Sequence, residues 1–129
     1  MQLTCLIIED ASFMREIYHY SLLKCENIRV VGEAADGEEA IKLLSELKPD
    51  IMLLDLVLPM KSGLDVLKEA SLISPNTKAI AVSSIEDERI IAKAKALGVI
   101  TYIKKPFTKA DLVAAFDEIS KHYSEVQNG

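Results

Sequence analysis

Charged and hydroxyl side chains in this sequence come directly after short apolar runs. Glu9 and Asp10 follow the first of these runs, Asp55 the third, Ser83 the fourth and Lys105 the fifth. If the runs are parallel strands of one open sheet, their carboxyl ends meet at one edge, where ligands of such sheets bind. We therefore predict that these five side chains form one site.

The three carboxylates of this set point to a bound cation. A single carboxylate after a strand is usually a helix cap or a solvated loop residue. Together, however, Glu9, Asp10 and Asp55 would repel one another and raise one another's pKa unless a cation lies among them. Oxygen ligands from few side chains, with room left for water, suit Mg²⁺. The sequence thus predicts a Mg²⁺ site at these three residues.

Asp55 is the candidate nucleophile of this site, because carboxylates form aspartyl-phosphate intermediates. A phosphoryl group that moves onto Asp55 spreads negative charge over three oxygens. The Lys105 ammonium, the Ser83 hydroxyl and the metal can each stabilise part of that charge. Lys105 is followed by Pro106 and Phe107, which is typical of a fixed turn. We predict phosphoryl transfer onto Asp55.

The apolar runs and the segments between them define the fold that must position this site. Several runs are continuous, as in parallel strands buried on both faces; the runs are Leu3–Ile8, Ile28–Val31, Ile51–Leu54, Ala79–Val82 and Val99–Ile103. The segments between and after them carry apolar residues at helical spacing, which predicts helices with one buried stripe. The stripes include Met14, Ile17, Tyr18 and Leu22, then Ala40, Ile41, Leu44 and Leu47, and finally Leu112, Phe116 and Ile119.

Strand and helix alternate five times, which predicts an α/β fold of the (βα)5 type, a doubly wound five-stranded parallel sheet with helices on both faces. Asp36-Gly37 precedes the second helix, Gly98 follows the fourth, and Thr108 and Asp111 open the fifth as a capping box. We expect one domain over residues 1–123 and a loose C-terminal tail over residues 124–129.

Composition limits the function further. The 129 residues are 50% hydrophobic and 27% charged, as in one folded domain. A net charge of −5 leaves no basic surface for direct binding of nucleic acid. The first apolar stretch has no basic region before it and ends in two carboxylates, so we expect neither a signal peptide nor membrane insertion, and a cytoplasmic location. Cys5 and Cys25 lack redox or zinc spacing and are expected to be reduced.

Four motifs now give the sequence a clear resemblance to the receiver domain of two-component response regulators, over nearly the whole chain. They are IED at residues 8–10, GEAADGEEA at residues 32–40, LDLVLP at residues 54–59 with Gly63, and YIKKPF at residues 102–107. The resemblance implies a flavodoxin-like receiver fold, similar to that of single-domain chemotaxis regulators. It also implies a signalling module that catalyses its own phosphorylation and slow dephosphorylation, and no turnover of an external substrate.

The resemblance further assigns roles within the site. It implies that Asp55 accepts a phosphoryl group from the phosphohistidine of a histidine kinase or a histidine phosphotransfer protein. Glu9, Asp10, Asp55 and the Val57 backbone carbonyl are implied to arrange the Mg²⁺.

Residues of the last two strands complete the implied machinery. The resemblance implies that Ser83 and Lys105 contact the phosphoryl group, that Tyr102 changes rotamer on activation, and that the Lys105–Pro106 bond is cis. Ser84 departs from the family, which usually has Ala or Gly there; its hydroxyl either narrows the pocket or accepts a hydrogen bond.

Other functions of such a fold are less compatible with particular residues. A flavodoxin-like redox module needs a phosphate loop rich in small and hydroxyl residues, where this chain has Glu9-Asp10-Ala11. A phosphohydrolase with an Asp nucleophile would need a second acid two residues after Asp55, where Val57 stands. The alternative that stays open is a protein-binding module that works without phosphorylation.

Candidate partner surfaces lie on two sides of the predicted fold. Phe13 is a possible docking residue for a kinase or phosphotransfer domain, although packing against a neighbouring loop explains it equally well. A group of lysines belongs either to the output face common in the family or to a solvated surface; it comprises Lys93, Lys95, Lys104 and Lys109. Because the chain ends just after the fifth helix, we expect no output domain and signalling through a downstream protein target. A phosphorylation-dependent dimer is compatible with the sequence.

Overall fold

A computed structural model describes residues 2–128, with side chains described through residue 123. Five strands alternate with five helices, which confirms the predicted (βα)5 fold. The strands are β1 (Leu3–Ile8), β2 (Ile28–Ala34), β3 (Ile51–Asp55), β4 (Lys78–Ser83) and β5 (Val99–Lys104). The helices are α1 (Ser12–Leu22), α2 (Gly37–Leu47), α3 (Gly63–Ile73), α4 (Glu88–Ala96) and α5 (Lys109–Asn128).

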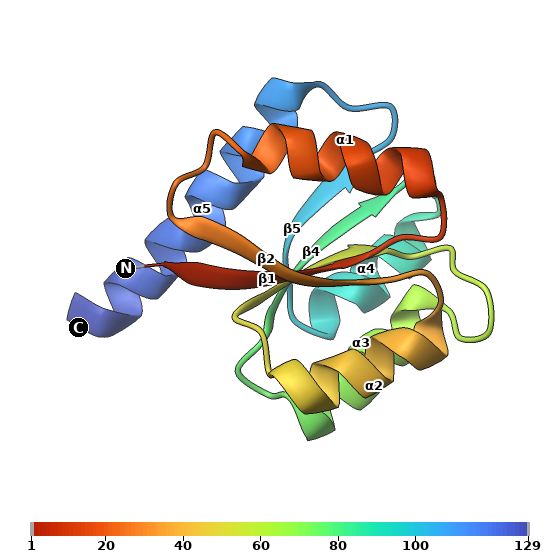
Figure 1. The fold of residues 1–129 in the computed structure, drawn as a ribbon. Coiled ribbons are helices and arrows are strands. Elements are labelled where there is room, and N and C mark those ends of the chain that lie inside the picture. The colour runs from red at the N-terminus through yellow and green to blue at the C-terminus, as the bar shows by residue number, and fades with distance from the viewer. Residues whose placement is uncertain (1, 129) are drawn as a thin grey trace.

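The strands form one parallel sheet in the order β2-β1-β3-β4-β5. Helices α1 and α5 cover one face, and α2, α3 and α4 cover the other (Figure 1). The strand order changes direction between β1 and β3, the place where open α/β sheets bind ligands. Asp55 pairs in register with Val82, and Ser83 pairs with Lys104, so the carboxyl ends of β3, β4 and β5 lie side by side.

Two apolar cores fill the spaces between the sheet and the helices. On the side of α1 and α5, Tyr18 and Phe116 are 1% exposed. On the other side, Ala40, Leu44 and Ala94 are completely buried. This two-sided burial explains why β3 and β4 are almost uninterrupted apolar runs.

Some boundaries and faces differ from the sequence predictions. Strand β2 continues to Ala34 instead of ending at Val31, because it keeps pairing with β1 after a register shift. Gly32 and the exposed Glu33 interrupt the apolar pattern there and hide this extension. Ile17 and Leu47, which the helical stripes placed inside, are 44% and 39% exposed. Ile17 lies at the edge of its stripe, and Leu47 is the last residue of α2.

Polar caps begin the later helices. The Asp36 carboxylate accepts from the Glu39 N–H and opens α2. Thr108 and Asp111 exchange hydrogen bonds of 2.9 and 3.1 Å, which confirms the predicted capping box of α5. The backbone of α5 then continues to Asn128, through most of the segment 124–129 that we expected to be a loose tail; Gly129 lies outside the described residues. No helix within residues 2–128 is long and apolar enough to cross a membrane.

Candidate functional site

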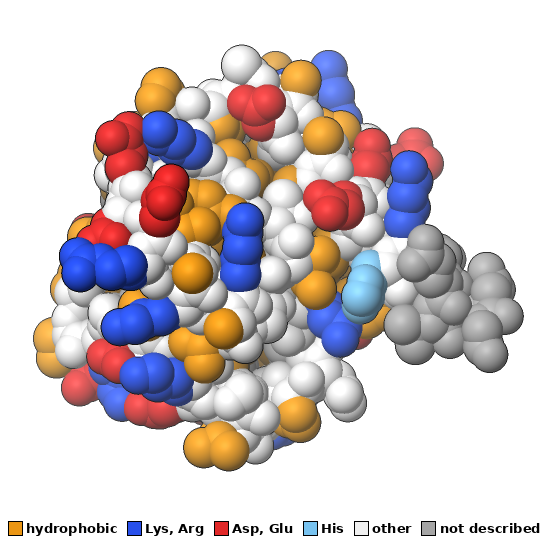
Figure 2. Space-filling model, turned by 180° about the vertical axis from the view of Figure 1, so that it is seen from behind, with side chains coloured by type: hydrophobic (Ala, Val, Ile, Leu, Met, Phe, Trp, Pro, Cys, Tyr) orange, Lys and Arg blue, Asp and Glu red, His pale blue; other side chains and the backbone are white. Residues whose placement is uncertain are grey.

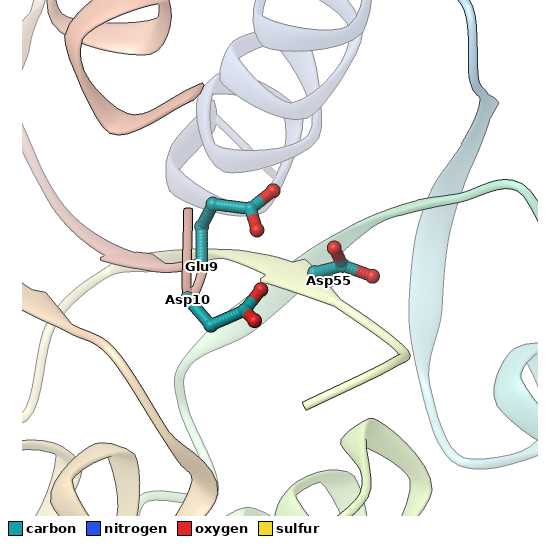
Figure 3. A group of neighbouring side chains, drawn as sticks. All are labelled: Glu9, Asp10 and Asp55. Atoms are coloured by element: carbon teal, nitrogen blue, oxygen red, sulfur yellow. The ribbon is translucent and has the colours of Figure 1, made fainter. Parts of the chain in front are cut away.

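Three carboxylates converge at the carboxyl ends of β1 and β3. Glu9 and Asp10 come from the residues directly after β1, and Asp55 ends β3 (Figure 3). One oxygen of each lies within 4.8 Å of the others. Glu9 and Asp55 are buried, at 1% and 7% exposure, whereas Asp10 is exposed to solvent. Three oxygen ligands at this spacing, with one side open to water, fit the coordination that Mg²⁺ prefers.

Lys105 reaches this acidic cluster from the end of β5. Its Nζ donates to Asp55 Oδ2 at 2.8 Å and to Glu9 Oε1 at 3.0 Å. The Lys105 N–H donates to the Ser83 carbonyl, which holds the backbone at this point. The Lys105–Pro106 bond is cis, as expected. The ammonium therefore bridges the two buried carboxylates.

The charges within this cluster shift its protonation equilibria. Burial raises the pKa of Glu9, and the nearby Asp55 charge adds to this effect; hydrogen bonds from Lys105 and the Ala11 N–H oppose it. Burial alone would lower the pKa of Lys105, but its hydrogen bonds and charge interactions with Asp55 and Glu9 raise that pKa above its ordinary value. Lys105 thus stays charged at neutral pH and compensates the two buried acids.

The loop after β3 orients Asp55. The Val57 N–H donates to Asp55 Oδ1 at 2.9 Å, so each carboxylate oxygen of Asp55 has a donor. The loop turns back on itself through a bond of 2.9 Å from the Gly63 N–H to the Leu56 carbonyl. A Cβ atom on Gly63 would collide with the Leu56 backbone, so only glycine permits this close turn. Val57 itself is 58% exposed and faces the solvent beside the site.

Ser83 and Tyr102 are connected through the backbone of Ile85. Ser83 is completely buried, and its Oγ accepts from the Ile85 N–H at 3.2 Å. The Tyr102 hydroxyl donates to the Ile85 carbonyl at 3.1 Å. The half-buried Tyr102 therefore contacts the same short segment that binds the Ser83 hydroxyl. Ser84 is exposed.

Two further residues, Arg15 and Tyr18, contact Glu9 or Asp10 and were not identified from the sequence as part of the site. The Arg15 guanidinium donates to the backbone carbonyls of Glu9 and Asp10 at 2.8 and 3.1 Å, and pairs with Glu33. The Tyr18 hydroxyl lies 3.5 Å from Glu9 Oε1. Helical spacing placed Tyr18 in the buried stripe of α1. A buried tyrosine normally needs a partner for its hydroxyl, which was the available signal.

The surface residues singled out in the sequence occupy separate places. Phe13 is 64% exposed on α1. The four lysines have different surroundings: Lys93 and Lys95 are exposed on α4, Lys104 pairs with Glu86 at 2.8 Å, and Lys109 lies over the Tyr20 ring on the side of α1. On the face shown in Figure 2, basic side chains alternate with acidic ones and with hydrophobic side chains, and no continuous basic surface is seen there.

Comparisons with known proteins agree with this architecture. The family model of the response regulator receiver domain matches residues 5–117. The chemotaxis protein CheY of Thermotoga maritima is 37% identical over 116 residues, which cover 90% of this chain and 96% of that protein. The receiver domain of AraT, a response regulator from Geobacillus stearothermophilus, has a TM-score of 0.90 at 29% identity and covers 98% of this chain and 99% of its own.

A chain of the CheX–CheY–BeF3–Mg²⁺ complex from Borrelia burgdorferi is also similar. Its TM-score is 0.82 at 25% identity, with 88% of this chain and 86% of that chain covered.

Proposed function

Because the chain belongs to the response regulator receiver domain family, we propose that it receives a phosphoryl group on Asp55 from the phosphohistidine of a histidine kinase or histidine phosphotransfer protein. Glu9, Asp10, Asp55 and the Val57 backbone carbonyl hold Mg²⁺ in this proposal. Phosphorylation then changes the contacts that the domain makes with a downstream protein. The cytoplasmic location expected from the sequence belongs to the same proposal.

The observation that carries this proposal is the position of Lys105. Its ammonium contacts Asp55 at 2.8 Å and Glu9 at 3.0 Å, within an acidic cluster that has an exposed side at Asp10. A buried carboxylate flanked by one ammonium group and two further acids is equipped to accept a phosphoryl group and to bind a divalent metal.

The residues of the chain have distinct roles in the transfer. The Val57 N–H and Lys105 hold the Asp55 carboxylate in one orientation, so that one oxygen forms a bond to phosphorus while the P–N bond of the donor breaks. The electron pair of that bond stays on the donor imidazole. The Ser83 hydroxyl and the Lys105 ammonium stabilise the negative charge on the transferred group. Bound Mg²⁺ would supply further positive charge to the phosphoryl oxygens.

The structural change that follows phosphorylation is proposed to occur beside β4 and β5. Ser83 and Tyr102 contact the same Ile85 backbone, through its N–H and its carbonyl. A hydrogen bond from Ser83 to a phosphoryl group would move this segment and with it the hydrogen-bond acceptor of Tyr102. The rotamer of Tyr102 is therefore expected to respond to phosphorylation.

The donor protein is proposed to dock beside α1. A groove of about 410 Å³ lies next to the site, lined by Met14, Ile17, Ser84, Lys105, Pro106 and Phe107. Phe13 adds an exposed aromatic ring on the same helix. Apolar side chains next to the acceptor suit the apolar surface of a phosphotransfer partner.

Phosphoryl uptake from a small phosphodonor tests the function. We expect Mg²⁺-dependent labelling of the wild type by acetyl phosphate and none in Asp55→Asn, with Asp65→Asn, an exposed acid on α3, as the matched control. Both variants should remain folded by circular dichroism. Undiminished labelling of Asp55→Asn would refute the acceptor assignment. No labelling of the wild type would favour the phosphorylation-independent binding module.

A further inference from the structure

Tyr18 on α1 is buried in the core and contacts two parts of the site, the Glu9 carboxylate and Phe107. It is 1% exposed, and its ring stacks on Phe107 with centroids 5.9 Å apart and planes inclined by 12°. Phe107 follows the Lys105–Pro106 turn. At the other end of the side chain, the hydroxyl lies 3.5 Å from Glu9 Oε1. Among residues 2–123, Glu9 is the only hydrogen-bond partner of this hydroxyl.

The Tyr18 phenol is a hydrogen-bond donor under ordinary conditions. A phenol ordinarily has a pKa of about 10, far above neutral pH. The phenol therefore keeps its proton. A protonated hydroxyl beside a carboxylate can only donate to it.

Glu9 needs more support than an aspartate would at this position. Its backbone is already held, because its N–H donates to the Ala34 carbonyl at 2.9 Å and its carbonyl accepts from Arg15. The glutamate side chain, however, has one more rotatable bond than aspartate, which adds freedom to the carboxylate. That end is held by the Ala11 N–H on Oε2, and by Lys105 and Tyr18 on Oε1.

We propose that Tyr18 is a positioning residue of the metal site, which orients the Glu9 carboxylate through its hydroxyl and braces the Lys105–Phe107 turn through its ring. This inference rests on the proposed function, because it concerns the Mg²⁺ affinity of the same site. Groups that hydrogen-bond to metal ligands fix the orientation of those ligands, and losing one typically weakens metal binding by about 10–100-fold. The bond of 3.5 Å is long, so we expect an effect near the lower end, about tenfold.

Tyr18→Phe tests the inference, because it removes only the hydroxyl and keeps the stacked ring. The matched control is Tyr20→Phe, which removes a hydroxyl from an exposed tyrosine on the same helix. Calorimetric titration with MgCl₂ alone gives the dissociation constant of each protein. We expect Mg²⁺ to bind Tyr18→Phe about tenfold more weakly than the wild type, and Tyr20→Phe like the wild type.

A double-mutant cycle with Glu9→Asp separates positioning from a general structural effect. The shorter aspartate cannot reach the Tyr18 hydroxyl, so adding Tyr18→Phe to Glu9→Asp should leave Mg²⁺ affinity unchanged. Equal Mg²⁺ affinities of the wild type and Tyr18→Phe, or an equal loss in both backgrounds, would overturn the inference and leave the proposed function standing. Absence of Mg²⁺ binding by the wild type would overturn both.

Discussion

Replacing Lys105 by Met should strongly destabilise the metal-free protein. The ammonium bridges Glu9 and Asp55, whose side chains are 1% and 8% exposed, and methionine keeps most of the length of the side chain without its charge. Removing one partner from a buried ion pair costs about 3–5 kcal/mol, because it leaves an uncompensated charge. Lys105 is 24% exposed, and Glu9 can take up a proton, so we expect the lower part of that range.

Urea denaturation at pH 7 without divalent metal measures this effect. Lys104→Met is the matched control, since Lys104 pairs with the exposed Glu86 and such surface pairs contribute little to stability. The penalty should also shrink as the pH falls. Without Lys105 the folded-state pKa of Glu9 lies even further above its unfolded value, so the folded state binds the proton more tightly and stability falls as the pH rises through that interval. If Lys105→Met costs no more than Lys104→Met at pH 7, the reasoning about charge compensation is wrong.

Four further predictions concern other parts of the molecule. Asp10→Ala should raise the free energy of unfolding of the metal-free protein by about 1 kcal/mol and should weaken Mg²⁺ binding. The reason is that carboxylates within 4.8 Å repel one another by about 0.9 kcal/mol per pair even in water. A loss of metal-free stability would instead make Asp10 a structural cap. Met60 has a φ of 71°, so Met60→Asn should stabilise the protein by about 0.5–1 kcal/mol in urea denaturation, and a destabilised variant would show that this turn is not strained. Burial raises the pKa of Cys5 to about 12, so mass spectrometry should find it unmodified by iodoacetamide in the native protein at pH 8 and alkylated only after unfolding. The apolar side chains of Val57 and Ile85 cannot orient an attacking water, so the protein should lose its phosphoryl group slowly after the donor is removed. The Val57→Asn, Ile85→Glu double variant should lose it faster. Equal rates of dephosphorylation would show that these positions do not control access of water.

The sheet was well predicted from the sequence, because strands that are buried on both faces are recognisable as short apolar runs. Short apolar runs, several of them continuous, identified all five strands, and polar residues directly after them marked the edge where the site lies. Strand β2 was the least complete prediction, since Gly32 and Glu33 lie near an edge of the sheet, where one side is less buried. Ile17 and Leu47 show the same limit for helices: spacing gives the direction of a side chain around the helix axis, but its exposure also depends on neighbouring elements and on where the helix ends.

The partners of individual side chains were harder to predict. The sequence indicated that the three acids require a cation and assigned that role to Mg²⁺, whereas in the structure Lys105 already contacts two of them. Its contact with Glu9 joins residues 96 positions apart, and only the packed sheet brings them together. The hydrogen bond of Tyr18 was not predicted for the same reason. Helical spacing indicates that its ring is buried, but it does not indicate which group accepts from its hydroxyl.

Lys105 also explains how one site can be stable both before and after it is loaded. Two buried carboxylates require a positive charge in the absence of metal, and the ammonium supplies it through bonds of 2.8 and 3.0 Å. In the proposed function, a metal and a phosphoryl group would arrive at the same place, and a rigid cation would then hinder one of them. The compact ammonium of lysine on a flexible stem can exchange Glu9 for a phosphoryl oxygen, whereas the planar fork of arginine is suited to one fixed arrangement. Lys105→Arg should therefore retain most of the metal-free stability that Lys105→Met loses, but accept a phosphoryl group from acetyl phosphate more slowly than the wild type. Phosphorylation at the wild-type rate in Lys105→Arg would show that the site needs only a positive charge there.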